Sequence, residues 1–309
     1  MTPCDSVLLI AFGGPEKADD IRPFLQIVTA GRRIPPERLE EVAHHYELIG
    51  GRSLLNELTF LQAAALERLL ARDGMSQPVY VGMRNWHPFL HETLGEMKDK
   101  GHRRALGIIL SAFQTEASWQ RYMVDVAVAF RKVGAGVPEV VYASPWGGHP
   151  RFIEAVADRV GEALARVPAE RRAATPLIFT AHSVPTAMAE ASPYVAQFTR
   201  ASREVAERLG HPRWTLAYQS RSGSPNDPWL EPDISDVLRR LVKEGVGEVV
   251  VVPIGFVCDH VEVLYDLDVE ARQVAEALGL GFHRATAAND HPAFVAMLAD
   301  LVKVGLRPS

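Results

Sequence analysis

The chain contains the apolar run Val249-Val250-Val251-Val252-Pro253-Ile254, and an acidic segment, residues 259–270, follows it closely. Four successive valines without polar alternation are typical of a strand buried on both faces, as in a parallel sheet covered by helices. The segment after the strand contains five carboxylates and no lysine or arginine before Arg272. The sequence therefore places a group of acids just beyond the carboxyl end of a buried strand.

Three of these acids are spaced by four residues. If the segment is helical, Glu262, Asp266 and Glu270 lie on one face, because each step rotates the side chain by only about 40°. They would form a stripe about 12 Å long. Like charges at this spacing destabilise a helix, and the helix dipole offsets the repulsion only in the first turn. A solvated acidic face explains the pattern equally well, but a cation held or passed along the stripe would remove the penalty.

Short apolar runs alternate with longer amphipathic stretches along the rest of the chain. This order predicts an α/β protein with two similar domains, each a four-stranded parallel sheet flanked by helices. We expect a boundary in the loop 144–150, with domains at 1–145 and 146–287; a C-terminal helix within 288–309 could pack back on the first domain. The expected strands are 7–12, 79–83, 105–110, 140–143, 177–180, 215–218, 249–254 and 281–285, and the expected helices include 58–71, 119–133, 152–167, 194–209 and 234–243.

Composition excludes several classes of protein. With 47% hydrophobic and 23% charged residues the chain is globular, and a net charge of -5 argues against nucleic acid as a partner. The two cysteines, Cys4 and Cys258, are too few for a four-cysteine iron–sulfur cluster. No glycine-rich dinucleotide or P-loop motif follows the first strand. The sequence shows no basic leader and no apolar stretch of membrane-spanning length, so we expect a cytoplasmic protein without an integral membrane segment.

His182 is the first candidate for chemistry, since it comes just after the predicted strand 177–180. A single histidine is more often structural than functional. Here, however, the carboxyl ends of parallel strands meet at one edge of a sheet, so His182 could face the acidic segment that follows strand 249–254. A neutral imidazole and a carboxylate make a half-site for Fe²⁺, Co²⁺ or Zn²⁺. Two protein ligands would hold such a metal weakly enough to hand it over.

Further sequence motifs occur along essentially the whole chain. They are Phe12-Gly13-Gly14-Pro15, Tyr46-Glu47-Leu48-Ile49-Gly50-Gly51-Arg52-Ser53, Gly82-Met83-Arg84-Asn85-Trp86-His87-Pro88, Thr180-Ala181-His182-Ser183-Val184-Pro185, Gln219-Ser220 and Pro253-Ile254-Gly255-Phe256-Val257-Cys258-Asp259-His260-Val261-Glu262. In this order the motifs resemble the ferrochelatase family, whose enzymes insert Fe²⁺ into a porphyrin. The resemblance implies a chelatase-like fold with two Rossmann-like domains and a porphyrin cleft between them.

The resemblance also implies roles on the metal side. His182 and Glu262 match the metal-binding and catalytic pair on opposite walls of the cleft. Asp266 and Glu270 match an acidic ladder, a possible secondary metal path. Fe²⁺ would be a substrate, so no prosthetic group and no iron–sulfur cluster is expected.

On the substrate side, the resemblance implies porphyrin contacts for Ser53, Tyr122 and Tyr46. Phe12 is a further expected substrate contact, at a position where some relatives place a tyrosine that can ligate product iron. Arg32 and Arg33 lie in the stretch 25–36, which matches the apolar lip of membrane-associated relatives. These arginines could pair with propionates, although surface arginines are more often simply solvated.

The short stretch 25–36 and the sequences at 229–233 and 255–257 are similar to those of the bacterial branch that uses coproporphyrin III. We therefore expect coproporphyrin III as the substrate, with protoporphyrin IX as the nearest alternative. Two other classes stay open. One is a cobalt or nickel chelatase of a corrin precursor. The other is a non-catalytic haem or porphyrin carrier, because residues 114–117 depart from the family pattern. We expect a monomer that contacts other haem-pathway enzymes transiently.

Overall fold

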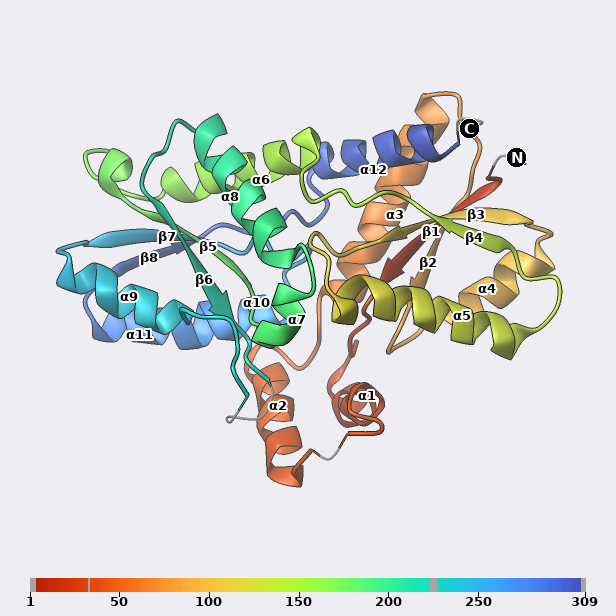
Figure 1. Ribbon diagram of the computed structural model, residues 1–309, viewed down its shortest axis with the longest axis horizontal. Helices are drawn as coiled ribbons and strands as arrows, with labels where there is room; N and C mark the ends of the chain where they lie inside the picture. The colour runs from red at the N-terminus through yellow and green to blue at the C-terminus, as the bar shows by residue number, and fades with distance from the viewer. Residues whose placement is uncertain (1–3, 33, 223–226, 307–309) are drawn as a thin grey trace. The chain divides into compact units, whose positions relative to one another are not determined.

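The computed structural model describes residues 4–32, 34–222 and 227–306, and its chain divides into two compact units (Figure 1). Unit 1 contains the residues up to Ser111, Ala117–Ser144 and those from Asp290 onward. Unit 2 contains Ala112–Glu116 and Pro145–Asn289. The main division falls after Ser144, and the short segment Ala112–Glu116 belongs to the second unit.

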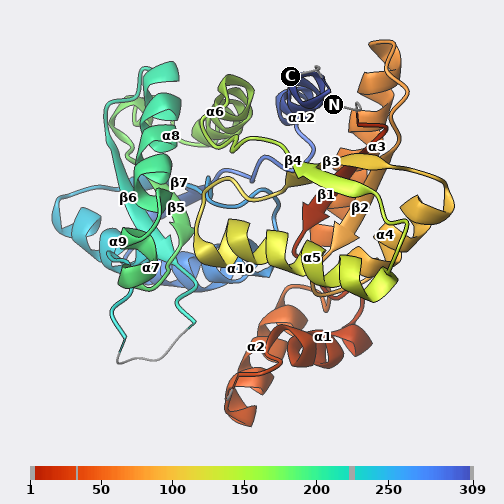
Figure 2. The same cartoon turned by 45° about the vertical axis from the view of Figure 1, so that its right-hand side comes forward.

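Unit 1 is built on a parallel sheet with strand order β2-β1-β3-β4. Helices α3 and α12 pack on one side of this sheet, and α4 and α5 cover the other (Figures 1 and 2). The elements are β1 (Ser6–Ala11), α1 (Ile21–Val28), α2 (Pro36–Leu48), α3 (Leu55–Arg72), β2 (Val79–Met83), α4 (Leu90–Asp99), β3 (Arg104–Ile109), a π-helical turn (Glu116–Gln120), α5 (Arg121–Val133), β4 (Glu139–Tyr142) and α12 (Pro292–Gly305).

The last helix, α12, returns to unit 1. It packs against α3 and β3, and Lys303 forms an ion pair of 2.8 Å with Asp73 at the end of α3. Its contact with the sheet is close, because a Cβ atom added at Gly305 would lie 2.7 Å from the Leu106 side chain. A side chain at position 305 would therefore require the Leu106 side chain to shift.

Unit 2 repeats the plan with strand order β6-β5-β7-β8, again all parallel. Helices α6 and α8 cover one face of the sheet, and α9 and α11 cover the other (Figure 1). The elements are α6 (Pro150–Leu164), β5 (Leu177–His182), α7 (Thr186–Glu190), α8 (Tyr194–Arg208), β6 (Trp214–Gln219), α9 (Ile234–Lys243), β7 (Glu248–Val252), α10 (Val261–Leu264), a π-helical turn (Asp266–Ala271), α11 (Arg272–Ala277) and β8 (Gly281–Arg284), with a short 3₁₀ turn at Arg172–Ala174. A similar 3₁₀ turn lies in unit 1 at Ala18–Asp20.

The local sequence explains why these elements form. Val249 and Val251 pack against α9 and α11, and β7 as a whole has helices on both faces, which is why its apolar run needs no polar alternation. Helix α9 begins where the Asp233 side chain accepts a hydrogen bond from the Ser235 N–H at 2.8 Å. Its apolar residues recur at helical spacing and all enter the core: Ile234, Val237, Leu238 and Leu241.

In unit 2 the strand order reverses between β5 and β7. The chain leaves β5 toward β6 on one side and leaves β7 toward β8 on the other. In such sheets, ligands bind beyond the carboxyl ends of the two strands at this switch point. His182 is the last residue of β5, and the acidic segment follows β7, so both lie at this edge.

The eight predicted strands are confirmed, with ends that differ by one or two residues. The acidic segment, in contrast, is not one continuous α-helix. After the single turn of α10, the Glu270 N–H donates to the Tyr265 carbonyl, five residues earlier, at 3.0 Å. Among the described residues, none of the helices combines the length and the apolar character required to cross a bilayer.

Candidate active site

His182 and Glu262 meet at the carboxyl edge of the sheet in unit 2. The His182 Nε2 lies 3.4 Å from the Glu262 Oε1, and the two side chains keep 30% and 38% of their surface exposed. They come from adjacent strand ends of one sheet rather than from separate walls. The His182 Nδ1 lies within hydrogen-bonding distance of the Ser183 carbonyl, to which only an N–H can donate. Neutral His182 therefore carries its proton on Nδ1 and presents the Nε2 lone pair toward Glu262.

The two groups hold each other in their charged forms. Burial alone would lower the pKa of His182, but the neighbouring Glu262 carboxylate and the Ser183 carbonyl raise it. Burial would raise the pKa of Glu262, but attraction and hydrogen bonding to His182, with help from His260, lower it to about 2. The coupling therefore favours a proton shared within the pair, and a cation that enters would take the place of that proton.

The backbone around Glu262 is fixed by two residues. His260 caps α10, because its Nδ1 accepts a hydrogen bond from the Glu262 N–H at 3.3 Å. The pKa of His260 is lowered, mainly by burial, which favours the form of the imidazole that can accept this bond. The Gln219 amide, at the end of β6, donates to the Glu262 carbonyl. The main chain of Glu262 is thus held from both sides, whereas its carboxylate remains partly exposed.

One step along the acidic segment, Asp266 accepts a hydrogen bond from Ser220 Oγ. Ser220 follows β6 directly and has a φ of 63°, an unusual value for a serine and one found at strained functional positions. Burial raises the pKa of Asp266 to about 7; Ser220 opposes the shift, and the neighbouring Glu262 and Glu270 add to it. Asp266 therefore gains or loses its proton near neutral pH.

Two further acids of the segment, Asp259 and Asp268, are neutralised by an arginine from strand β8. Arg284, at the end of β8, binds Asp259 at 2.8 Å and Asp268 at 2.8 Å. Asp259 also accepts hydrogen bonds from Asn289 and from the Ala287 N–H. Four of the five carboxylates thus fall into two sets: Asp259 and Asp268 belong to the Arg284 network, while Glu262 and Asp266 lie at the His182 end of the sheet.

In unit 1, two predicted substrate contacts belong to one aromatic cluster. The Phe24 ring lies edge-on to three rings, with centroid distances of 6.4 Å to Phe12, 6.1 Å to Tyr46 and 6.1 Å to Trp86. Phe12 is 37% exposed at the end of β1, whereas Tyr46 is buried. The cluster forms an apolar surface beyond the carboxyl end of β1, which suits a flat aromatic ligand.

Tyr122 and Ser53 lie near the same cluster. The Arg84 guanidinium stacks 4.5 Å from the Tyr122 ring centre and 5.6 Å from that of Phe12, and it forms an ion pair of 2.5 Å with Asp125. Ser53 is buried against Gly14, where an added Cβ would lie 2.6 Å from the Ser53 side chain. The structure therefore groups four of the predicted substrate contacts (Phe12, Tyr46, Ser53 and Tyr122) within unit 1.

Arg32 is exposed in the turn after α1, where its backbone N–H donates to the Thr29 carbonyl at 2.9 Å. Its side chain forms no hydrogen bond or ion pair with another residue of the part of the chain that the structure describes. The guanidinium is thus available to a carboxylate ligand. Arg33 lies outside the described residues.

Within the described ranges, three or more His, Cys, Asp or Glu side chains never gather as ligands for one metal ion. His182 and Glu262 therefore stand as a two-ligand pair with the acids behind them. Sequence reasoning missed three residues that organise this site: His260, Ser220 and Arg284. The sequence signal that could have identified His260 was its position two residues before Glu262. For Ser220 the signal was its position at the end of a predicted strand. The acidic segment itself contains no signal for Arg284.

The family model described as Ferrochelatase matches residues 4–306 of this chain. The chain belongs to the ferrochelatase family. Its relatives include the coproporphyrin III ferrochelatase of Mycobacterium avium (strain 104), with 45% identity over 301 residues, 96% of this chain and 87% of that protein. The coproporphyrin III ferrochelatase of Streptomyces coelicolor is 43% identical, with 97% of this chain and 85% of that protein covered. The ferrochelatase of Rhodopirellula baltica is 42% identical, with 98% and 86% covered.

Solved structures extend the likeness of this ferrochelatase-family chain at the level of the fold. SirB from Bacillus subtilis with Fe³⁺ aligns with a TM-score of 0.56 and 12% identity, covering 97% of this chain and 95% of that chain. CbiX, the terminal enzyme for biosynthesis of siroheme in denitrifying bacteria, aligns with a TM-score of 0.55 and 16% identity, covering 98% and 100%. At such low identity these likenesses show a shared two-unit fold and nothing about the substrate.

Proposed function

We propose that this member of the ferrochelatase family inserts Fe²⁺ into coproporphyrin III. The observation that carries the proposal is the contact between His182 and Glu262 at the switch point of unit 2, in a chain 45% identical to a coproporphyrin III ferrochelatase. A base and a metal ligand in one place are what the reaction needs. A porphyrin must lose two pyrrole protons while the metal enters its centre, so an acceptor must stand within hydrogen-bonding distance of the ring.

His182 is the better acceptor of the two. The bond from Nδ1 to the Ser183 carbonyl fixes the ring orientation and leaves Nε2 to exchange a proton or bind the cation. Glu262, with a pKa lowered to about 2, stays ionised and balances the positive charge that passes between the two groups. Because the pair is closely coupled, its protons belong to the pair and not to one residue.

Asp266 and Glu270 supply a route for the cation before it reaches the pair. With its pKa raised to about 7, Asp266 can be neutral when the route is empty and ionised when a cation arrives, so it neither repels Glu262 permanently nor traps the metal. The π-helical turn also keeps the Asp266 and Glu270 carboxylates near one face. Four residues of a π-helix rotate by slightly less than one full turn, whereas four residues of an α-helix rotate by slightly more.

For the porphyrin, we propose contacts in unit 1 with Phe12, Tyr46, Ser53 and Tyr122, and a carboxylate contact with the exposed Arg32. Coproporphyrin III carries four carboxylates, so an available guanidinium favours it over protoporphyrin IX. We also infer a cytoplasmic monomer that needs no prosthetic group. The two cysteines cannot supply the four thiolates of an iron–sulfur cluster.

The decisive experiment is anaerobic turnover of the purified chain with Fe²⁺, in parallel with coproporphyrin III and protoporphyrin IX, followed by absorbance. Faster conversion of coproporphyrin III supports the proposal. Faster conversion of protoporphyrin IX would overturn the substrate and the role of Arg32. Tight binding of both porphyrins without turnover would make the chain a carrier. Preference for Co²⁺ or Ni²⁺ with a corrin precursor, at equal free metal concentration, would make it a different chelatase.

A further inference from the structure

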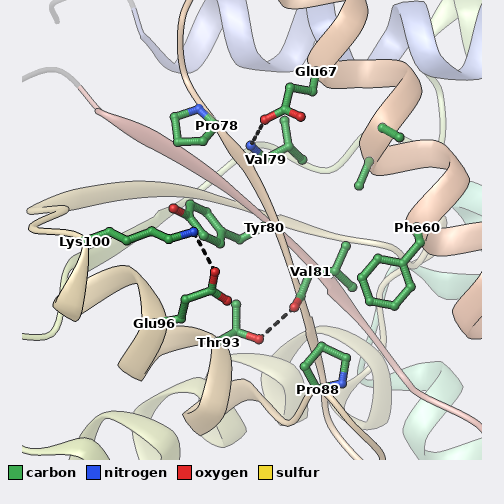
Figure 3. Close-up of a pocket in the computed structure, with 12 residues that line it drawn as sticks. Phe60, Glu67, Pro78, Val79, Tyr80, Val81, Pro88, Thr93, Glu96 and Lys100 are labelled. Atoms are coloured by element: carbon green, nitrogen blue, oxygen red, sulfur yellow. Dashed lines mark hydrogen bonds and ion pairs between the residues drawn. The ribbon is translucent and has the colours of Figure 1, made fainter.

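A cavity of about 360 Å³ opens in unit 1 at the free edge of its sheet, between helices α3 and α4 (Figure 3). Most of its wall is apolar and comes from Phe60, Ala63 and Ala64 of α3, from Val79 and Val81 of β2, and from Pro88. None of these residues belongs to the proposed chelatase site. The volume lies in the range of small-ligand pockets.

Strand β2 forms the floor of this cavity with its unpaired edge. It pairs with β1 through alternate residues: Val7 N–H donates to the Pro78 carbonyl and Arg84 N–H to the Ala11 carbonyl. In a parallel ladder every second residue turns its N–H and C=O groups away from the paired strand, here β1. Val79, Val81 and Met83 therefore point their backbone groups toward the open edge.

Most of these edge groups already have partners. Val79 N–H donates to Glu67 at 3.3 Å, the Val81 carbonyl accepts from Thr93 Oγ1 at 2.7 Å, and Met83 N–H donates to the Pro88 carbonyl at 2.8 Å. Among the described residues, nothing donates to the Val79 carbonyl and nothing accepts from the Val81 N–H. The Val79 carbonyl and the Val81 N–H thus remain as one acceptor and one donor in the wall of the cavity. Their spacing is that at which one residue of a neighbouring extended chain pairs with both.

The charges around the cavity indicate in which orientation an extended peptide would bind. Glu96 is neutralised by Lys100 at 2.7 Å, whereas Glu67 uses one oxygen for the Val79 N–H and has no cation among its described partners. Figure 3 shows Glu67 beside Val79 at one end, and Phe60 and Pro88 beside Val81 at the other. An extended peptide parallel to β2 would place its amino end near Glu67 and its next side chains on the apolar end.

We propose that this edge binds the amino-terminal residues of a partner protein in an extended conformation. One residue of the partner would donate to the Val79 carbonyl and accept from the Val81 N–H, while its α-ammonium pairs with Glu67. The apolar end offers no described cation for a free carboxylate, which favours the start of a longer chain over a free dipeptide. A long strand does not fit, because Phe89 forms a bridge to Met83 and closes the edge beyond Val81.

The test uses tripeptide probes and the full chain. Ala-Val-Ala-amide with a free amino group should bind, shift the Val81 amide resonance and slow its hydrogen exchange. N-acetylation should weaken binding about 2–5-fold, as for an exposed ion pair. N-methylation of the central residue should weaken it at least about fivefold through loss of the backbone bond. The free-acid peptide should bind less tightly than the amide.

Two variants with matched controls locate the site. Glu67→Gln keeps an acceptor for Val79 but removes the charge, so acetylating the probe should cause no further loss; Glu57→Gln on the same helix is the control. Ala64→Phe should fill the cavity and abolish binding, whereas Ala71→Phe should not. Chelatase activity should stay unchanged in all four variants. An unperturbed Val81 amide at millimolar probe overturns the proposal, as do equal binding of the N-methylated probe and concentration-dependent dimerisation that protects Val81.

Discussion

Arg284 places its Nη1 2.8 Å from the Oδ1 of Asp259, a carboxylate that keeps only 9% of its side-chain surface exposed. The same guanidinium binds Asp268 at 2.8 Å, so one residue of β8 holds both ends of the acidic segment. Arg284→Met should leave these acids without their cation and lower the free energy of unfolding by about 3–5 kcal/mol. Urea unfolding at neutral pH measures the loss.

Arg240→Met is the control for this variant, because the contacts of Arg240 with Glu244 and with the Thr215 hydroxyl are both exposed. It should change stability by less than about 1 kcal/mol. Equal effects of the two variants would show that the Arg284 network contributes no more than a surface pair.

His182→Ala should reduce iron insertion by about 10²–10⁴-fold, since it removes both the proton acceptor and a ligand of the proposed pair. Porphyrin affinity, measured by fluorescence quenching, should change by less than about twofold, because the proposed ring contacts lie on other residues. His44→Ala, which alters an exposed imidazole in unit 1, should leave both quantities unchanged. Normal turnover of the His182 variant would remove this residue from the reaction.

Glu262→Gln should lower the pKa of His182, because the carboxylate of Glu262 is the main group that raises it. NMR titration of the imidazole carbon resonances gives this pKa directly. Since insertion requires the neutral imidazole, the rate of the parent chain should fall as pH decreases through the His182 pKa. The remaining activity of the variant should persist to lower pH. A His182 titration that is the same in both proteins contradicts the coupling.

Asp266→Asn should change how stability depends on pH. The pKa of Asp266 is raised from 3.8 to about 7, mainly by burial, so the folded chain keeps a proton that the unfolded chain releases. Asp266 therefore makes the protein less stable as pH rises from about 4 to about 7. We expect the variant to match the parent near pH 4 and to exceed it by about 1–3 kcal/mol near pH 8, allowing for partial exposure.

Urea unfolding across this pH range tests the Asp266 prediction, with Asp236→Asn as an exposed control that should show no such trend. A stability difference that is constant with pH would mean that Asp266 is already ionised throughout.

Arg32→Gln should raise the KM for coproporphyrin III by about 2–5-fold and leave that for protoporphyrin IX nearly unchanged, because the exposed guanidinium is proposed to pair with one of the extra carboxylates. Steady-state kinetics with both porphyrins measure the difference. Arg38→Gln, which removes a nearby arginine paired with Glu41, serves as the control. An equal rise for both porphyrins would assign Arg32 a general electrostatic role.

Much of this architecture could be predicted because its signals are local. The valine run of β7 identified a strand buried on both faces, and the Asp233 cap with its apolar repeat matches α9, whose predicted range, 234–243, is confirmed. His182 and Glu262 could be paired because adjacent parallel strands end at the same edge.

The remainder depends on contacts that the local sequence does not encode. The partner of Asp259 is Arg284, 25 residues later and on another strand, so the acidic segment looked uncompensated. The π-helical turn at Asp266–Ala271 changes one hydrogen-bond step without changing the four-residue spacing of the acids. The positive φ of Ser220 is equally hidden, since serine is not a residue that favours it.

The proposed metal groups all belong to unit 2, and the proposed ring contacts all belong to unit 1. Selection can therefore act on the choice of metal and on the choice of tetrapyrrole separately. A descendant could exchange one tetrapyrrole for another by substitutions around Phe12, Tyr46 and Tyr122 alone, and inherit its metal-handling residues unaltered. A change of metal would follow the opposite route, through the surroundings of His182.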